Sequence, residues 1–376
     1  MAELQQTFDL CIEKTRQTMS KLTSELWDFA EDQNGKYFKR KEKWTSFNDI
    51  GCWVPSFISG RGVMAYEATG DREFLKWSNR FAGQYKSKVN EYAEQTMHDL
   101  GFLYSPYSVN LYRLTGSGEH RQAAMQAANV LAQRFVVRGG YLKAWGKMSD
   151  NERGTWGYGL TIIDSMMNVP LLFWAWRETG NYFFYDTAVQ HCETVAKYMI
   201  RADYSVYHAY RFDFESGEAL QGENYCGYGK ESYWARGAAW AIYGYAIAYG
   251  YTMNPAYLDL SCKLALAFIG ELDEQLVPVW DFRLPDGEAP HRDSSAAAIA
   301  ATAFLELSGF NKNEPAFAIW ADRLIARLSE PDYLDVNPSV PGLLKQSNGK
   351  NVYTVFGDYF YMEAIGKRLS IIRHCW

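Results

Sequence analysis

The sequence of 376 residues lacks the basic runs that nucleic-acid-binding proteins use to contact phosphates. It carries 38 Lys and Arg against 44 Asp and Glu, which gives a formal net charge of −6. The N-terminal segment MAELQQTFDLCIEK contains acids and has none of the basic-then-apolar pattern of a secretory signal. We therefore expect no nucleic-acid partner and a cytoplasmic location.

Long hydrophobic runs and paired cysteines are also missing. The longest uncharged run, residues 237–258, contains several glycines and is broken by Asn254 and Pro255, which favours a buried helix and a turn over a membrane span. The six cysteines are scattered, without a Cys-x-x-Cys pair, which is typical of reduced thiols. We expect no membrane partner and a monomer or homodimer.

Motifs for cofactors and metals are absent as well. There is no His-Glu-x-x-His, no P-loop, no glycine-rich dinucleotide fingerprint after a strand and no Gly-x-Ser-x-Gly. The pair His98-Asp99 alone supplies too few ligands for a metal. The sequence therefore predicts a protein with no metal and no cofactor.

Aromatic residues are abundant, at 16% of the chain with 13 Trp, 27 Tyr and 21 Phe. Aromatic rings fill protein cores, and they also stack on the faces of sugars. This composition favours a carbohydrate ligand without proving one.

A helical hairpin recurs along the chain. Five times an apolar helical stretch ends in a glycine-containing turn and a second helix follows, and each turn glycine is expected to take the left-handed conformation that ends a helix. The five glycines are Gly70, Gly116, Gly180, Gly250 and Gly309. The pattern predicts twelve helices, at 4–31, 56–69, 72–91, 99–115, 118–136, 161–179, 182–201, 235–250, 254–272, 293–308, 313–329 and 357–370.

Every second predicted helix is poor in charge and rich in small or aromatic residues, as expected for a helix buried on all sides. Six such inner helices surrounded by six amphipathic outer helices form an all-α (α/α)6 barrel. We expect one domain over 1–376, with short strands near 207–213 and 277–283 at its active-site mouth.

Inner helices of such a barrel run in the same direction, so their N-terminal ends meet at one mouth. Six helix N-termini give that mouth a positive backbone potential, which suits an anionic ligand. The segments at these ends carry the most reactive side chains of the chain. They are Trp53, His98, Asp99, Asp164, Trp234, Arg236, Trp240, Asp293 and Asp358, and His208 lies on the strand predicted over 207–213.

Asp164 is the most unusual of these residues, because the surrounding stretch TIIDSMMNVPLLFWAW is otherwise suited to a core. Burial is expected to raise the pKa of its carboxyl towards neutrality, as a general acid requires. Asp99 would provide a second carboxylate in the same mouth, so the pair could divide acid and base roles.

Each candidate also has a structural interpretation. Asp99, Asp293 and Asp358 could simply cap helices. His208 could be a hydrogen-bonded structural histidine, and Arg236 could pair with a buried acid instead of a substrate carboxylate.

Eight stretches together resemble the unsaturated glucuronyl hydrolases, glycoside hydrolase family 88, over nearly the whole chain. They are HDLGFLYS (98–105), AWG (144–146), TIIDSMMNVPLLFWA (161–175), YH (207–208), YWARGAAWAIYG (233–244), VWDF (279–282), RDSSAAAIAA (292–301) and YTVFGDYFYMEA (353–364). The resemblance implies hydration of the C4=C5 double bond of a non-reducing-end unsaturated uronic acid in lyase-generated oligosaccharides. The products are a 4-deoxy-5-keto uronic acid and the partner sugar.

The resemblance also implies roles for individual residues. Asp164 matches the catalytic acid and base, and Asp99 matches the second aspartate, which orients the ring hydroxyls and tunes Asp164. Substrate contacts are implied for the remaining mouth residues, namely Trp53, His98, His208, Trp234, Arg236, Trp240, Asp293 and Asp358.

Three stretches depart from the family pattern: Trp53 to Ile58, Tyr225-Cys226-Gly227, and the loop QSNGKNV before Tyr353. They leave the identity and sulfation of the leaving sugar open. Three alternatives also remain. The first is an unsaturated rhamnogalacturonyl hydrolase, the second a sugar epimerase using His98 and His208, and the third a sugar-binding protein with an inactive site.

Overall fold

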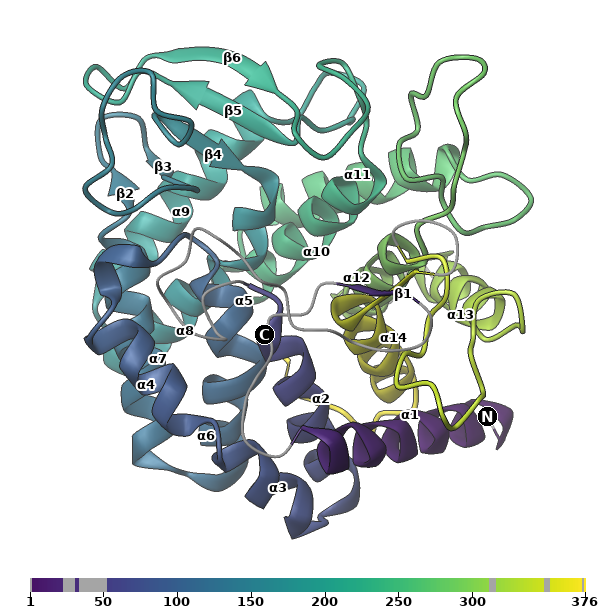
Figure 1. Ribbon diagram of the computed structural model, residues 1–376. Coiled ribbons are helices and arrows are strands. Elements are labelled where there is room, and N and C mark those ends of the chain that lie inside the picture. The colour runs from purple at the N-terminus through teal and green to yellow at the C-terminus, as the bar shows by residue number, and fades with distance from the viewer. Residues whose placement is uncertain (1, 23–30, 34–52, 311–315, 348–351, 374) are drawn as a thin grey trace.

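In the computed structural model of the protein, inner and outer helices alternate along the chain (Figure 1). The structure describes residues 2–22, 31–33, 53–310, 316–347, 352–373 and 375–376. The inner helices are α2 (Pro55–Thr69), α5 (Leu100–Tyr104) with α6 (Asn110–Thr115), α8 (Pro170–Thr179), α10 (Ala235–Thr252), α12 (Ser294–Phe310) and α14 (Val355–Arg368). The outer helices are α1 (Ala2–Lys21), α3 (Arg72–Asn79) with α4 (Ala82–Asn90), α7 (Gly118–Ala132), α9 (Tyr182–Tyr198), α11 (Pro255–Gly270) and α13 (Ala316–Leu328).

The inner helices form a closed ring. Each contacts the next, from α2 through α5, α8, α10 and α12 to α14, and α14 returns to α2. Each inner helix also packs against an outer helix adjacent in sequence, for example α10 against α11, whereas α1 packs across the closure between α14 and α2. The predicted (α/α)6 barrel is confirmed.

Composition explains which helices lie inside. In α10 nearly every residue is buried, and Arg236 is its one charged residue. Small residues let the inner elements approach closely, since a Cβ on Gly244 would lie 2.5 Å from the Cβ of Met166. By contrast, α13 buries only one stripe, with Phe317, Ala321 and Leu324 inside. No helix in the described part of the chain is long and apolar enough to cross a bilayer.

Three short antiparallel sheets accompany the helices (Figure 1). The largest joins β4 (Leu160–Ile162), β5 (Ala209–Phe212) and β6 (Ala219–Glu223), with Ile162 opposite Ala209. The others pair β2 (Phe135–Val136) with β3 (Tyr141–Leu142), and β1 (Glu31–Gln33) with β7 (Val352–Thr354). The predicted strand over 207–213 is confirmed as β5, whereas 277–283 forms only isolated bridges, Val279 with Arg292 and Asp281 with Trp234.

Three predicted helices are interrupted. The prediction over 161–179 is wrong at its start, because the β-branched residues Thr161 and Ile162 belong to β4 and a 3-10 turn, Ile163–Met167, precedes α8. The helix over 99–115 contains a π-helical turn, Ser105–Val109, at Pro106, which has no N–H to donate. The helix over 72–91 breaks between α3 and α4, where Arg80 and Phe81 donate to carbonyls only three residues back.

Two of the five turn glycines were predicted wrongly. Gly70, Gly116 and Gly180 have φ values of 68°, 70° and 69° and end their helices as expected. Gly250 and Gly309 instead lie inside α10 and α12, and Met253, with φ 56°, takes the left-handed position after α10. The helix predicted over 4–31 is shorter in the structure, because α1 ends at Lys21 and Glu31 belongs to β1. Residues 23–30 of this prediction lie outside the described part of the chain, as do residues 313–315 of the helix predicted over 313–329.

Candidate active site

The predicted mouth residues meet through a chain of contacts. Trp53 packs against Phe356 and Phe102, with ring centroids 4.8 and 5.3 Å apart, and Phe102 packs against Trp240 at 5.0 Å. The Arg236 guanidinium lies 5.1 Å from the Phe356 ring. Segments remote in sequence therefore surround one end of the barrel.

Asp164 lies in the 3-10 turn between β4 and α8, not in the first turn of an α-helix as predicted. Its carboxylate is only 13% exposed, and Oδ2 is buried without a hydrogen-bond partner among the described residues. Burial raises its pKa to about 6, against a smaller lowering by its own backbone N–H and by Arg236. The expected shift towards neutrality is therefore present.

Asp99 immediately precedes α5, and its carboxylate is 17% exposed. Burial and then the charge of Asp164 raise its pKa to about 7, whereas Lys88 and Arg134 act in the opposite direction. The charge of Asp164 therefore lies close enough to Asp99 to oppose its ionisation. The His98 ring is fully buried, and its Nε2 lies 3.3 Å from Asp99 Oδ1. Burial holds the pKa of His98 well below its usual value.

Asn168 fixes the two acidic turns to each other. Its side chain accepts from the N–H of Phe102 at 2.8 Å and donates to the carbonyl of Asp164 at 3.1 Å. Gly101 lets the backbones touch, because a Cβ there would lie 2.5 Å from the carbonyl oxygen of Asn168. The turn that carries Asp99 is therefore held rigidly against the turn that carries Asp164.

His208 immediately precedes β5, outside the strand on which it was predicted, and approaches Asp164 from there. Its Nδ1 accepts from the N–H of Tyr225 at 3.0 Å, and its Nε2 lies 3.8 Å from Asp164 Oδ2. Burial, with a contribution from Arg236, lowers its pKa to about 3, so the ring is neutral. Because Nδ1 is an acceptor, the proton of the neutral ring lies on Nε2 and points towards the acid.

Arg236 lies between Trp234 and Phe356, with its guanidinium 4.9 Å from the Trp234 ring. It forms an ion pair with Asp293 and donates to Ser295 Oγ at 3.2 Å. Asp293 is fully buried and also accepts from the N–H groups of Ser295 and Ala296, so it caps α12 while holding Arg236. Trp234 packs edge-on against His208 at 5.0 Å.

Two more predicted contact residues lie deeper. Asp358 is fully buried, pairs with Arg61 at 3.4 Å and accepts from the N–H of Leu344 at 2.9 Å. Trp240 is also fully buried, packed between Phe102 and Phe360. Both side chains are therefore packed among other residues of the barrel interior, beneath the residues that surround the mouth.

An aromatic group beside His208 was missed as a site by sequence reasoning. Trp145 and Trp156 stack with centroids 4.1 Å apart and planes at 6°, and Tyr225 packs edge-on against both. Trp145 lies 5.9 Å from the His208 ring. The sequence shows the stretch Ala144-Trp145-Gly146 and the difference from the family pattern at Tyr225. Only the fold brings these two segments into contact.

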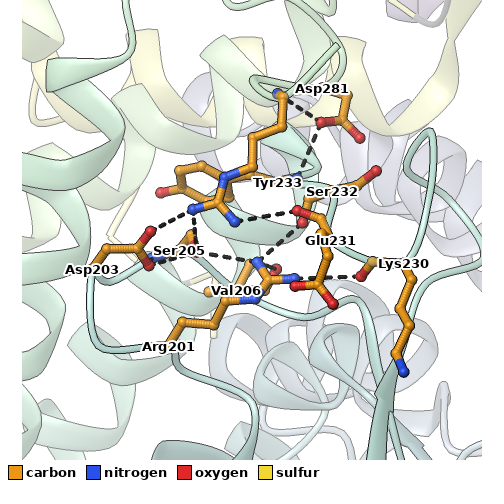
Figure 2. A network of polar contacts seen from close by, with 10 residues as sticks. Arg201, Asp203, Ser205, Val206, Lys230, Glu231, Ser232, Tyr233 and Asp281 are labelled. Carbon is orange, nitrogen blue, oxygen red and sulfur yellow. Dashed lines mark hydrogen bonds and ion pairs between the residues drawn. The ribbon is translucent and has the colours of Figure 1, made fainter. Parts of the chain in front are cut away.

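A polar network holds the segment that leads into α10 (Figure 2). Asp281 accepts from the N–H groups of Tyr228 and Tyr233 at 2.8 and 3.1 Å. Arg201 donates to the carbonyls of Val206, Ser232 and Lys230. Arg283 donates to Asp203, to Ser205 and to the carbonyl of Glu231. The network thus fixes residues 228–233, the part of the loop that leads into Trp234.

Arg134 plays a comparable part on the Asp99 side. This buried side chain donates to the main-chain carbonyls of Thr96, Lys143, Ala144, Trp145 and Gly146. The N–H of His98 also donates to the carbonyl of Ala144 at 3.1 Å. One guanidinium therefore ties the segment just before Asp99 to the loop bearing Trp145.

Replacing Arg134 by Lys should reduce kcat/KM by about tenfold or more, because an ammonium has three donors and cannot reach five carbonyls arranged around a planar fork. Steady-state kinetics on an unsaturated disaccharide would measure this loss. Arg138 is exposed in the turn between β2 and β3, so Arg138→Lys serves as the matched control and should leave kcat/KM unchanged. Equal kinetics for the two variants would contradict the positioning role.

The geometry supports proton transfer to a neutral or anionic guest. One face of the site carries two carboxyls with raised pKa values, another carries the Nε2–H of His208, and a third carries the guanidinium of Arg236, paired with Asp293. Aromatic rings line the approach. Such a set of groups is suited to general acid–base chemistry.

Comparison with known proteins gives relatives along most of the chain. Residues 18–260 match the family model described as Glycosyl Hydrolase Family 88. The chain is 32% identical to the unsaturated glucuronyl hydrolase of Bacillus sp. (strain GL1) over 329 residues, which is 85% of this chain and 86% of that protein. It is also 32% identical to the unsaturated chondroitin disaccharide hydrolase of Streptococcus pyogenes serotype M1, over 96% of this chain and 90% of that protein.

Solved structures resemble the fold closely. The crystal structure of unsaturated glucuronyl hydrolase from Bacillus sp. GL1 matches with a TM-score of 0.90 and 29% identity, covering 99% of this chain and 98% of that one. An unsaturated glucuronyl hydrolase specific for heparin matches with a TM-score of 0.87 and 28% identity, covering 98% and 97%.

Proposed function

Because the chain belongs to glycoside hydrolase family 88 and is a hydrolase of oligosaccharides that carry an unsaturated uronic acid, we propose that Asp164 and Asp99 carry its reaction. The observation that supports this assignment is the pair of carboxyls held together by Asn168 and Gly101. Burial raises the pKa of Asp164 to about 6 and that of Asp99 to about 7, so both keep their protons to a higher pH than an ordinary aspartate does.

The first step is proton transfer to carbon. The C4=C5 bond of the substrate is a vinyl ether, conjugated through O5, so C4 is its nucleophilic carbon. The protonated carboxyl of Asp164 gives its proton to C4, and positive charge develops at C5 and O5. The resulting Asp164 carboxylate lies next to that charge and stabilises it.

Water addition completes the cycle. Asp164, now ionised, takes a proton from a water molecule whose oxygen bonds to C5, which forms a hemiketal. Cleavage of the C5–O5 bond gives a ketone at C5 and leaves a hemiacetal at C1, which releases the partner sugar. One water is consumed: its hydroxyl oxygen bonds to C5, its proton restores the protonated form of Asp164, and the proton first given by Asp164 stays on C4.

The other mouth residues bind and orient the substrate. We assign the uronate carboxylate to Arg236 and to the N-terminal end of α10, where the backbone potential is positive. Asp99 and the Nε2–H of His208 would hold ring hydroxyls. The aromatic group of Trp145, Trp156 and Tyr225 offers ring faces to the leaving sugar.

The decisive experiment follows two signals on lyase-generated disaccharides from chondroitin, hyaluronan, heparin, gellan and pectin. Hydration of the double bond removes its ultraviolet absorbance and releases the partner sugar at the same rate. Sugar release with the absorbance retained would indicate direct displacement at C1, and no change with any substrate would contradict the proposal. The ranking of the five disaccharides would identify the preferred leaving sugar.

The alternative of a sugar epimerase is not supported by the site. Two opposed histidine bases would be needed, but burial lowers the pKa of both His98 and His208, and the His98 ring is fully buried behind Asp99. The comparisons also place the chain among hydrolases, which excludes an inactive sugar-binding role as its family function.

The reaction should slow at alkaline pH. The pKa values of Asp164 and Asp99 are raised to about 6 and about 7, so the proton donor persists through mildly acidic pH and is lost above it. Well above these values kcat should fall by about tenfold per pH unit, as the protonated fraction does. Measurements of kcat at saturating disaccharide from pH 4.5 to 8.5 would test this, and a rate that stays constant to pH 8.5 would contradict it.

The protein is also proposed to act in the cytoplasm, as a monomer or homodimer. In support, Cys11, Cys192, Cys226 and Cys375 form no disulfide in the described part of the chain, as expected in a reducing compartment. Cell fractionation and light scattering would test location and assembly.

A further inference from the structure

A second cavity, of about 440 Å³, lies at the opposite end of the barrel from the acids. Its walls come from the C-terminal halves of the inner helices α6, α8, α10, α12 and α14 and from the segment after α14. The lining includes Arg113, Arg177, Tyr251, Glu306, Lys367 and Arg373. Because α10 rises about 1.5 Å per residue, Gly250 in this wall lies roughly 20 Å from Arg236 in the acid site.

Positive charge dominates this cavity. Four cationic side chains line it, against the single carboxylate of Glu306. Lys367 is neutralised, because its Nζ lies 2.8 Å from Glu306 and 3.3 Å from Glu363. Arg113, Arg177 and Arg373 have no side-chain carboxylate within ion-pair distance in the described part of the chain. Arg177 and Arg373 therefore keep their charges, whereas Arg113 contacts the main-chain oxygen of Trp376, the last residue of the sequence.

Helix capping accounts for only part of this arrangement. A cation near a helix C-terminus stabilises the free carbonyls there, and Arg177 does so by donating through one nitrogen to Gly250 and Tyr251 at 2.7 and 3.3 Å. Arg113 donates to the Tyr251 hydroxyl and to the main-chain oxygen of Trp376 at 3.1 and 3.0 Å. A guanidinium has five donors, so each keeps N–H groups for a ligand.

Aromatic rings stand beside these charges. Tyr251 lies under Arg177, with the guanidinium 4.1 Å from the ring centroid. Phe310, Tyr243 and Trp376 also line the cavity. Arg177 and Arg373 are exposed, so the cavity opens to solvent. The combination offers donors for oxyanions and ring faces for a sugar.

We propose that this cavity is a binding site for phosphate or a small phosphate monoester such as a sugar phosphate. The phosphoryl oxygens would accept charge-assisted hydrogen bonds from Arg113, Arg177 and Arg373, whose forks match that geometry. The aromatic wall would contact the organic part. The site is independent of the proposed hydrolase reaction.

Titration calorimetry and thermal unfolding of the full chain would test the proposal with inorganic phosphate, glucose 6-phosphate and glucose, against sodium chloride at matched ionic strength. Saturable binding of at least one phosphate compound, without binding of glucose, is expected. Tighter binding of glucose 6-phosphate than of phosphate would identify an ester as the ligand class, and equal binding would identify the free ion.

Variants separate this site from surface charge. Arg113→Gln and Arg373→Gln should each raise Kd by about tenfold or more, the loss expected for a hydrogen bond to a charged group. Arg72→Gln, exposed at the start of α3, is the matched control and should bind like the parent protein. Disaccharide turnover, carried out about 20 Å away, verifies that each variant is folded. No saturable binding of either phosphate compound, or binding unchanged in both cavity variants, would overturn the proposal.

Discussion

Asp164→Asn should abolish turnover while making the protein more stable. The amide cannot donate a proton to C4, so kcat should fall by about 10³-fold or more, the range attributed to general acid catalysis. Binding of the unsaturated disaccharide should persist, since the amide keeps nearly the same shape. Single-turnover absorbance and equilibrium dialysis would measure the two effects separately.

The expected gain in stability follows from the sign of the pKa shift. The native carboxyl has a pKa of about 6, above its ordinary 3.8, so it binds its proton more tightly when folded. Its ionisation in the buried site costs stability as pH rises from about 4 to 6. A rise of about two units corresponds to about 3 kcal/mol as an upper bound, and its partial exposure reduces this.

Denaturant unfolding at two pH values would test this explanation. The Asn variant should exceed the parent protein by about 1–3 kcal/mol at pH 7.5 and by much less at pH 4, where the parent acid is protonated. Equal stability at both values would show that burial of Asp164 carries no energetic cost. Retained turnover would remove Asp164 from the catalytic role.

Gly101→Ala should damage the site without touching any acidic residue. The new Cβ would lie 2.5 Å from the carbonyl oxygen of Asn168, a contact with backbone that cannot rotate away. Relief requires the Asp99 turn to separate from the Asp164 turn. We expect a loss of about 1–3 kcal/mol in stability, as for overpacking, and about 100-fold in kcat, as for a displacement near 1 Å.

Gly83→Ala provides the matched control. A Cβ at Gly83, in α4, meets nothing within 4 Å, so this variant should keep full activity and gain up to about 1 kcal/mol from helix propensity. Circular dichroism, unfolding midpoints and disaccharide kinetics on both variants would decide the question. If Gly101→Ala behaved like Gly83→Ala, the close contact would not be what fixes the two acids.

Several features of the site lie beyond sequence reasoning. Asp293 looked like a helix cap or a substrate contact, and the structure shows a cap that also pairs with Arg236. Arg134 carries no signal in the sequence, because a guanidinium bound only to carbonyls has no partner side chain to form a motif. The stack of Trp145 on Trp156 depends on a loop conformation, which local patterns do not specify.

The sequence by itself determined the helical repeat, the division into inner and outer helices, and the unusual cost of Asp164, because periodicity and burial of charge are encoded locally. It could not determine where helices are interrupted, as at β4 and Pro106, since strand pairing and packing decided those points. Only the tertiary structure decided that burial raises the pKa values of Asp99 and Asp164. It also decided that Arg113, Arg177 and Arg373, which pair with no side-chain carboxylate in the described residues, meet at the far end. The reason is physical: desolvation and electrostatic coupling depend on distances between segments that the chain brings together only on folding.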